Sequence, residues 1–591
     1  MARRDSIMQK PKDSRGAFRR LLRTLGPFRW MIAGVAALCV LSNLLSLYGP
    51  SLAGQAINEA AAGKGKVDLA RVTVLAGRML ACYLSASLLT FAIHTMMVNI
   101  SRRFARNMRQ QVFDKLMRLP VGFFDRNQAG DVISRVSYDI DVIATCMATD
   151  VVSILTSVVT VLGSLVMMLS ISPLLSLVTL FSVPAAILYT SHMRKLTQPR
   201  FRERSKRYGR MNGFVEEMLS GQKTIQAYAY EATAEERFDG VNTAAAEGYW
   251  EADRYGVTIG PTMGLINNVT LGLIALLGSV LYMQPVPLIG LGEISSFVLY
   301  SRKFSGPINE IANIINELFS ALAASERVFS LLDEEEETAD LPGAFVHTQV
   351  RGDVAMEDVS FGYEEGKRIL HSLSLHAEPG RLFAIVGPTG AGKTTIINLL
   401  MRFYDVDEGR VLLDGVDLRD ATRESVRRSW AMVLQDTWLF RGTIFDNIAY
   451  GKPDATMDEV VAAAKAAHIH AFIMHLPEGY RTVISEDGGN ISKGQKQLLT
   501  IARAMLYDAR MLILDEATSN VDTETERRIQ KAMRNLMHDK TCFVIAHRLS
   551  TIRGADNILV LNHGDVVEQG TYESLMARRG FYWKLYAAQF E

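Results

Sequence analysis

The sequence predicts a protein of two parts, an α-helical membrane domain in the first half and an α/β domain in the second. Long runs without Asp, Glu, Lys or Arg occur before residue 332, and about 20 apolar residues suffice for one helix to cross a bilayer. After residue 346, short apolar segments rich in β-branched residues alternate with helical segments, which is typical of α/β domains. The length of 591 residues accommodates both parts.

The composition excludes several classes of protein. Charged residues make up 21% of the chain and hydrophobic residues 48%, which excludes a disordered protein. The net charge is +1, so no overall basic field attracts nucleic acid, and we expect no nucleic-acid partner. The cysteines lack the spacing of a zinc site or a disulfide framework, and a reducing compartment fits them. They are Cys39, Cys82, Cys146 and Cys542.

Charge-free runs predict five membrane-spanning helices, and a sixth is expected after them. The run over 151–193 is about twice the length of one crossing, and Ser172-Pro173 near its middle is a turn signal, so it represents two helices. The helix that contains 79–100 keeps a helix-forming composition through Leu119 and extends beyond the lipid. The other predicted helices cover 31–58 and 256–292, the latter ending at Pro285 and Pro287, and the sixth starts near Leu291.

The sixth predicted helix differs from the others because it carries charged residues. Such side chains are costly against lipid. We therefore expect this helix to face protein, a wet cavity or the cytosol. Its charged residues are Glu293, Arg302, Lys303, Glu310 and Glu317.

Loop charges predict a multi-pass protein of the cell membrane with both termini in the cytosol. Residues 1–29 are rich in Arg and Lys, and so are the loops at 102–109 and 194–204, whereas the turns near Pro173 and Pro285 carry no basic residue. Basic loops remain on the cytosolic side of membranes. Residues 15–30 place Phe18, Leu21, Leu22, Leu25 and Phe28 on one side of a helix and predict an amphipathic helix at the interface.

These observations divide the chain into four segments. They are an N-terminal tail with the interfacial helix (1–30), the six-helix membrane domain with its cytosolic loops (31–332), a linker (333–345) and the α/β domain (346–591). The linker is placed at the acidic run 333–337 and at Pro342-Gly343. We interpret the acidic run as solvated rather than as a metal site.

A glycine-rich segment follows the predicted strand 382–386 and opens a helix at Lys393. It matches GxxxxGK[ST], the P-loop pattern in which backbone N–H groups wrap nucleotide phosphates at a helix N-terminus. Lys393 adds a positive charge at the β and γ positions, and Thr394 is a candidate Mg²⁺ ligand. The candidate contacts of a nucleoside triphosphate are Gly387, Pro388, Thr389, Gly390, Ala391, Gly392, Lys393, Thr394 and Thr395.

Two further apolar strands, at 511–514 and 542–546, end in polar residues. Ligands of doubly wound sheets bind at the carboxyl ends of strands. Asp515 is a candidate to hold Mg²⁺ through water, and Glu516 a candidate to orient or deprotonate the attacking water. His547 is a candidate contact of the γ-phosphate. The alternatives are an acidic pair at the surface and a structural histidine.

A short segment upstream of Asp515 carries a resemblance to a known family. Ile491-Ser492-Lys493-Gly494-Gln495 resembles the LSGGQ signature of ATP-binding cassettes. Nearly the whole chain is similar to a half-transporter of the ATP-binding cassette (ABC) exporters, in which a six-helix membrane domain of exporter type is fused to an α/β P-loop NTPase cassette. The resemblance implies that ATP and Mg²⁺ are bound and that ATP hydrolysis is coupled to transport.

The resemblance also assigns roles to residues. It implies that Tyr363 stacks on the adenine and that Gln435 contacts Mg²⁺ and the membrane domain. It assigns catalysis to Glu516, His547 and Gln435, and it implies that Ser492, Gly494 and Gln495 contact the nucleotide that a second cassette holds. It also implies a dimer-interface loop at 519–522 and cytosolic coupling loops within 123–135 and 209–217.

The signature departs from the family pattern, because Lys493 replaces a glycine and Ile491 a leucine. Signatures of this form, in chains that keep Glu516 and His547, resemble the catalytic subunit of heterodimeric multidrug exporters. The resemblance thus implies a second half-transporter subunit as partner. The alternative is a homodimer with two equivalent sites.

The resemblance implies export of lipophilic small molecules, drugs or lipids, by alternating access. A homodimeric lipid or peptide exporter and an ATP-gated channel or sensor remain alternatives. Candidate cavity-lining residues are polar and lie within or near the membrane, although interhelical hydrogen bonding explains the asparagines equally well. They are His94, Asn99, Asn267, Asn268 and Glu293. Met96, Met97, Met167 and Met168 are interpreted as ordinary packing rather than as an adaptable binding surface.

Overall fold

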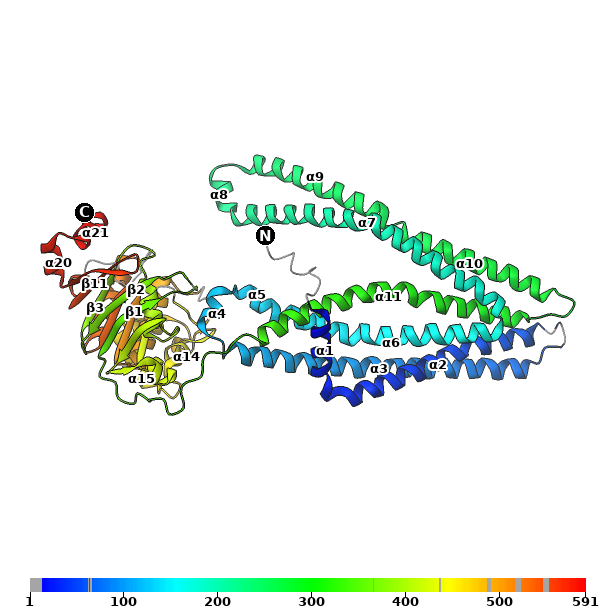
Figure 1. The fold of residues 1–591 in the computed structure, drawn as a ribbon, viewed down its shortest axis with the longest axis horizontal. Coiled ribbons are helices and arrows are strands. Elements are labelled where there is room, and N and C mark those ends of the chain that lie inside the picture. Colours follow the sequence, from blue (N-terminus) through cyan, green and yellow to red (C-terminus); the bar gives the residue numbers. More distant parts are fainter. Residues whose placement is uncertain are drawn as a thin grey trace. The chain divides into compact units, whose positions relative to one another are not determined.

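The chain forms two compact units in a computed structural model (Figure 1). The structure describes residues 13–61, 63, 66–364, 366–434, 437–485, 490–515, 522–545 and 552–590. The helical unit comprises Met1–Arg118 and Gln128–Glu335, and the α/β unit comprises Leu119–Asn127 and Glu336–Glu591. The boundary at residue 335 falls inside the segment that the sequence suggests as a linker.

The helical unit is built from long helices that follow the predicted order. They are α1 (Ser14–Thr24), α2 (Arg29–Ala60), α3 (Leu69–Leu116), α5 (Ala129–Ser134), α6 (Ile140–Ile171), α7 (Pro173–Ser220), α8 (Gln222–Ala227), α9 (Glu231–Gly256), α10 (Ile259–Tyr282) and α11 (Leu291–Leu332). Within the described residues, five helical segments are long and apolar enough to cross a membrane. The charged α11 is not among those five, but it begins at Leu291 as expected and is long enough to be the sixth.

The break between α6 and α7 has a local cause. The Ser172 side chain accepts a hydrogen bond from the backbone N–H of Leu175, and Pro173 occupies the first turn of α7. Proline is tolerated there because the first N–H groups of a helix have no intrahelical partner. The prediction of two helices in the run 151–193 is confirmed.

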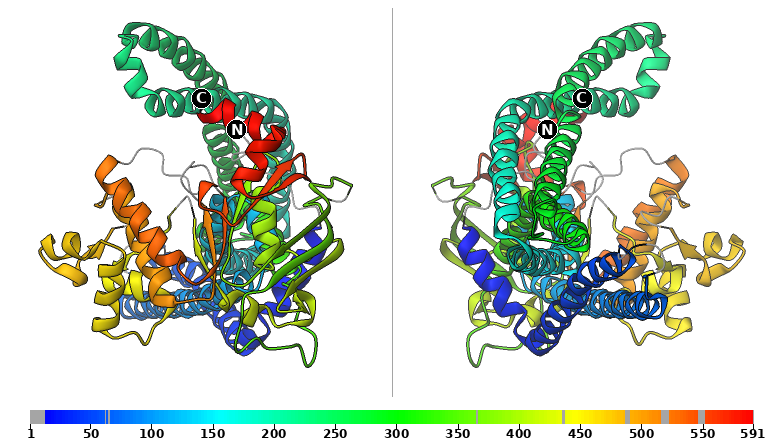
Figure 2. Two further views of the ribbon diagram at one scale, coloured as in Figure 1. Left: turned by 90° about the vertical axis from the view of Figure 1, so that its left-hand side faces the viewer. Right: turned by 90° about the vertical axis from the view of Figure 1, so that its right-hand side faces the viewer.

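One prediction about the cytosolic ends of these helices is wrong. The stretch 209–217, expected to contain a coupling loop, belongs to the continuous helix α7. The turn lies farther along the chain, where the short helix α8 joins α7 to α9. Figures 1 and 2 show α7, α8 and α9 diverging from the group formed by α2, α3, α6 and α11. No residue of α8 is buried within this chain.

A proline inside α2 determines how α2 and α11 pack. Pro50 has no N–H, so the carbonyl of Ser46, four residues earlier, lacks its usual helical partner. The Lys303 ammonium of α11 donates hydrogen bonds to this carbonyl at 3.0 Å and to the Ser46 hydroxyl at 2.6 Å. The Tyr300 hydroxyl donates to the carbonyl of Leu47 at 2.6 Å. Lys303 is thus satisfied by protein, as expected for a charge in this helix.

The α/β unit contains a six-stranded sheet in the order β12-β11-β3-β10-β9-β6 and a four-stranded sheet in the order β2-β1-β4-β5. The six-stranded sheet is made of β3 (Leu382–Val386), β6 (Trp430–Val433), β9 (Met511–Asp515), β10 (Thr541–Ile545), β11 (Asn557–Asn562) and β12 (Asp565–Gly570). The other consists of β1 (Val354–Phe361), β2 (Leu370–Ala377), β4 (Glu408–Leu413) and β5 (Val416–Asp417). The pair β7 (Gly442–Thr443) and β8 (Val483–Ile484) lies apart from both.

Alternating side chains of the six-stranded sheet enter two different cores. Phe383, Ile385 and Phe543 pack toward the four-stranded sheet and α12 (Lys393–Leu400). Ala384 and Val544 pack on the opposite side. The helices on that side are α14 (Ile444–Ile448), α15 (Met457–Ala466), α16 (His470–His475), α17 (Lys493–Tyr507), α18 (Thr523–Met537), α20 (Tyr572–Arg578) and α21 (Phe581–Phe590). The short helix α13 (Arg423–Arg428) precedes β6. The sheet is therefore rigidly supported on both faces.

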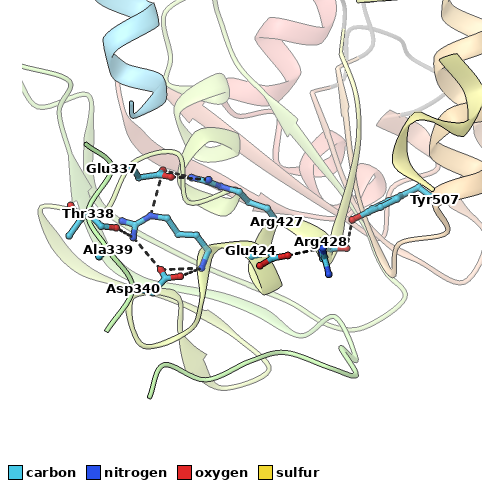
Figure 3. Close-up of a pocket in the computed structure, with 9 residues that line it drawn as sticks. Glu337, Thr338, Ala339, Asp340, Glu424, Arg427, Arg428 and Tyr507 are labelled. Atoms are coloured by element: carbon cyan, nitrogen blue, oxygen red, sulfur yellow. Dashed lines mark hydrogen bonds and ion pairs between the residues drawn. The ribbon is translucent and has the colours of Figure 1, made fainter. Parts of the chain in front are cut away.

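The linker is attached to the α/β unit by ion pairs around a cavity of about 540 Å³ (Figure 3). Arg427 donates to both carboxylate oxygens of Glu337, the longer contact being 3.1 Å. Arg423, nearly buried, donates to the Asp405 carboxylate at 2.7 Å and to the Thr338 carbonyl at 2.5 Å. The interpretation of the acidic run as merely solvated is therefore wrong for Glu337. Nothing in the sequence pattern distinguishes this residue from the other acidic residues of the run.

Candidate nucleotide site and membrane cavity

The predicted P-loop connects β3 to α12, as the sequence indicates. Gly390 and Gly392 have φ values of 81° and 99°, in the left-handed region that favours glycine. At Gly387, a Cβ atom would lie 2.4 Å from the backbone oxygen of Leu561. These glycines therefore permit a backbone path that other residues would block, and that path leads directly into a helix N-terminus.

The Lys393 side chain spans this loop. Its ammonium donates hydrogen bonds to the carbonyl oxygens of Gly387 at 2.8 Å and Pro388 at 3.0 Å. Burial lowers the pKa of Lys393, and the negative charge of Asp515 opposes this shift. A half-buried ammonium with two neutral acceptors gains more from a phosphate than a solvated one does. Thr394, next along α12, is exposed.

Tyr363 lies against the helix that the P-loop opens. Its hydroxyl donates to Oγ1 of the buried Thr395 at 3.3 Å and accepts from the Asn398 amide at 2.9 Å. Its ring contacts Tyr404 edge-on, with 5.0 Å between centroids. The ring is thus held beside the P-loop helix while part of it stays exposed. Thr395 is buried and accepts this hydrogen bond, and its role as a nucleotide contact stays a prediction.

Sheet register aligns the strand ends from which the other candidate residues follow. The parallel pairs match Ile385 with Ile545 and Ile545 with Asp515, and β6 runs parallel beside β9. The carboxyl ends of β3, β10, β9 and β6 therefore share one edge. Gln435, Glu516 and His547 follow three of these ends in sequence, but they lie outside the described residues, as do 519–521. Their roles remain predictions.

The signature segment forms the start of α17. The Ser492 side chain accepts from the backbone N–H of Gln495 at 3.4 Å, and the Gln495 side chain accepts from the Ser492 N–H at 2.9 Å, which completes a capping box. Gly494 is buried, whereas Lys493 is exposed in the first turn. A lysine at this end opposes the helix dipole, so its position is not explained by helix stability.

The described residues fit a nucleoside triphosphate. The glycine path leaves backbone N–H groups at the start of α12, and Lys393 is available within the same loop. The donors for a divalent cation are hard oxygen atoms, those of Thr394 and Asp515, which suits Mg²⁺. Sequence analysis missed Tyr404, which has no motif around it, although it supports Tyr363.

Tyr404 also contacts a segment that comes from between α3 and α5 in the sequence. The short helix α4 (Val121–Arg126) belongs to the α/β unit. The Tyr404 hydroxyl donates to the Asp125 carboxylate at 2.6 Å, and a Cβ at Gly122 would lie 2.9 Å from the Tyr404 ring. Burial, followed by the Asp125 carboxylate, raises the pKa of Tyr404, so its hydroxyl remains a donor. The predicted first coupling loop 123–135 thus overlaps α4.

The polar candidates of the membrane domain have different surroundings. Asn267 and Asn268 line a cavity of about 270 Å³ between α10 and α11. Glu293 caps α11, accepting from the Gly290 N–H at 2.8 Å, and is not among the residues that line this cavity, so its role as a cavity residue stays a prediction. Asn99 bonds the Thr95 carbonyl of its own helix, and His94 is exposed. Met97 and Met168 are buried, in keeping with ordinary packing.

A P-loop at the edge of a supported sheet, in one chain with helices long enough to span a membrane, defines an ATP-driven membrane transporter. Family models confirm this class. Residues 31–308 match the ABC transporter transmembrane region, and residues 370–519 match the ABC transporter domain. The chain belongs to the ABC transporter family and couples ATP hydrolysis to transport.

Named relatives cover nearly the whole chain. The Bacillus subtilis protein described as the uncharacterized ABC transporter ATP-binding protein YfiC is 42% identical over 98% of this chain and 96% of its own length. A fatty acid ABC transporter ATP-binding/permease protein of Mycobacterium bovis is 44% identical over 88% of this chain and 82% of that protein. The structure of a bacterial Atm1-family ABC exporter with ATP bound matches with a TM-score of 0.74 and 29% identity, covering 95% of this chain and 99% of that one.

Proposed function

We propose that this chain is one subunit of a heterodimeric exporter that moves lipophilic small molecules, drugs or lipids, across the cytoplasmic membrane by alternating access. The observation that carries the proposal is the glycine cradle with Lys393, present in a chain that also supplies apolar membrane-spanning helices. The similarity to a protein described as a fatty acid transporter supports a lipophilic substrate.

In the proposed ATP site, the backbone of Gly387–Gly392 and the Lys393 ammonium hold the phosphates, and Tyr363 stacks on the adenine. Thr394, Gln435 and Asp515 hold Mg²⁺, which neutralises charge on the phosphate oxygens. Glu516 orients or deprotonates the attacking water, and His547 contacts the γ-phosphate. Both termini are cytosolic in this proposal, because the basic loops then lie in the cytosol.

A second chain completes the site. Ser492, Gly494 and Gln495 of one subunit contact the nucleotide held by the other, so the terminal phosphate favours the closed pair. Shifting such an equilibrium from about 1:99 to about 99:1 requires about 5.5 kcal/mol, which two nucleotides supply through contacts present only in the closed state. The unburied α8 and the divergence of α7 and α9 support a partner, because they leave surface uncovered in this chain.

The heterodimer rests on Lys493. Its exposed position at the start of α17 adds a cation where the family pattern has glycine, so this signature departs from the family pattern. The competent site then pairs this chain's P-loop and Glu516 with the signature of a different subunit. In the alternative homodimer, Lys493 points away from the phosphate and both sites are equivalent.

The test is to express the chain alone and together with subunits that copurify from its native membrane, and to measure ATPase activity in lipid nanodiscs. We expect low turnover alone and full turnover in the mixed complex. Full, cooperative turnover of the single chain would reject the heterodimer. Uptake of a lipophilic dye into inside-out vesicles against a gradient separates a pump from an ATP-gated channel, which only equilibrates the dye.

A further inference from the structure

The cavity between α10 and α11 is lined by polar groups from both helices. Its lining residues are Gly264, Asn267, Asn268, Thr270, Leu271, Ser301, Arg302, Ser305 and Gly306. Residues 264, 267, 268 and 271 follow helical spacing and share one face of α10, and residues 301, 302 and 305 share one face of α11. Arg302 carries the one formal charge among the described lining residues, and no carboxylate is present there.

The depth of the cavity makes this charge unusual. With a rise of about 1.5 Å per residue, Arg302 lies about 16 Å along α11 from its start, and Asn268 about 21 Å from the end of α10. Both positions fall well inside a hydrocarbon layer of about 30 Å. A charge at such depth is costly, and in membrane proteins it marks a substrate path or a protein partner.

Other polar groups of the helical unit have protein partners at comparable positions. Lys303 bonds Ser46, and the Asn43 amide bonds the Cys39 carbonyl while its oxygen accepts from Thr160. By contrast, within the described residues Asn267, Asn268 and Arg302 form no hydrogen bond or ion pair. Interhelical hydrogen bonding therefore does not explain these asparagines, and three adjacent polar side chains are left to face the cavity.

We propose that this cavity binds the anionic head group, a carboxylate or a phosphate, of an amphiphile that the protein exports. The proposal rests on the function proposed above and specifies its substrate class. The planar guanidinium of Arg302 matches the two oxygens of a carboxylate or phosphate, and the amides of Asn267 and Asn268 add neutral donors. Ser301 and Ser305 provide hydroxyl groups beside them.

The size of the cavity indicates a head group rather than a whole lipid. Its volume of about 270 Å³ is below the roughly 300–1,000 Å³ of typical ligand pockets. Gly264 and Gly306 contribute to this space, since a Cβ at either position would meet no described atom within 4 Å. An apolar tail would extend outside the cavity, along the exposed hydrophobic side chains of α10 such as Leu265 and Leu276.

The test measures ATPase stimulation of the native complex in nanodiscs of neutral lipid, with oleate, dodecyl phosphate and methyl oleate as probes. Arg302→Gln is expected to raise the half-maximal concentration of oleate and dodecyl phosphate at least tenfold and to leave that of the uncharged methyl oleate unchanged. Arg302→Lys, which keeps the charge, is expected to change them less than threefold. Arg237→Gln, the same change at an exposed position on α9, serves as the matched control with no expected effect.

Gly264→Leu tests the space itself without altering charge. Gly264→Leu is expected to weaken stimulation by both anionic probes, and Asn268→Leu is expected to weaken that stimulation at least threefold. The test therefore does not depend on correct assembly of the Arg302→Gln variant.

An unchanged oleate response in Arg302→Gln, or an equal loss for oleate and methyl oleate, would overturn the inference. A response to oleate alone assigns a carboxylate, and to dodecyl phosphate alone a phosphate. If methyl oleate stimulates as well as oleate, this inference fails while export stands, whereas absence of stimulation and transport by all probes removes the proposed function too.

Discussion

The P-loop and the membrane cavity are two binding sites built on opposite principles. The P-loop is made by backbone, with glycines at φ values of 81° and 99° and a lysine bonded to carbonyls of the same loop. The cavity is made by side chains of α10 and α11, and neither helix contains a recognisable motif. A backbone cradle needs fixed residues at fixed spacing. A side-chain cavity needs only compatible residues at positions that packing brings together, so it can change its ligand without changing the fold.

The largest expected effect concerns the backbone site. Glu516→Gln should lower ATP turnover at least about a hundredfold while ATP stays bound, because a group that acts in the transition state is lost. Turnover is measured by phosphate release and binding by a fluorescent ATP analogue. Glu524→Gln, an exposed carboxylate at the start of α18, is the control. Unchanged turnover of Glu516→Gln would remove this residue from the role of base.

Lys393→Ala should act one step earlier, on nucleotide binding. The ammonium that now bonds two carbonyl oxygens would be absent, and a charge-assisted hydrogen bond of about 1.5–3 kcal/mol is lost, which weakens binding roughly tenfold to a hundredfold. Titration with labelled ATP measures the affinity. Lys465→Ala, at an exposed position on α15, is the control, and normal binding by Lys393→Ala would contradict the phosphate assignment.

A third prediction concerns packing around the membrane cavity rather than its ligand. Lys303→Met should lower the free energy of unfolding of the helical unit by about 1–3 kcal/mol, because the Ser46 carbonyl freed by Pro50 loses its donor. Thermal unfolding in one detergent measures this loss. Adding Pro50→Ala restores an N–H for that carbonyl and should recover part of it. Equal losses in the single and double variants would show that Lys303 acts through something other than the free carbonyl.

The smallest expected effect is at Tyr404. Tyr404→Phe keeps the ring beside Tyr363 but removes the hydrogen bond to Asp125, worth about 0.5–1.5 kcal/mol. Transport per ATP hydrolysed should fall about twofold to tenfold, with ATP affinity unchanged. Parallel measurement of vesicle uptake and phosphate release checks this ratio. Asp125→Asn keeps an acceptor and should behave more like the native chain; a loss of ATP affinity in Tyr404→Phe would assign Tyr404 to nucleotide binding instead.

Sequence patterns predicted some elements closely and others not at all. β3 and the start of α12 agree with the prediction because a buried parallel strand reads as a short apolar run and the P-loop motif marks the helix start. β1 and β2 were not predicted, since their exposed positions interrupt the apolar run. The coupling loop at 209–217, placed by resemblance alone, was misplaced: this stretch continues α7, which tolerates Gly209 and Gly213.

The sequence by itself determined the membrane-spanning runs, the P-loop and the family, because hydrophobic length and the spacing of catalytic motifs are local properties of the chain. Tertiary structure decided which polar residues have partners. Glu293 and Glu337 are engaged in a cap and an ion pair, Lys303 satisfies a carbonyl that a proline on another helix leaves free, and Arg302 beside it faces a cavity. Neighbouring charges on one helix point in different directions, and only the packing of other helices around them sets what each one meets.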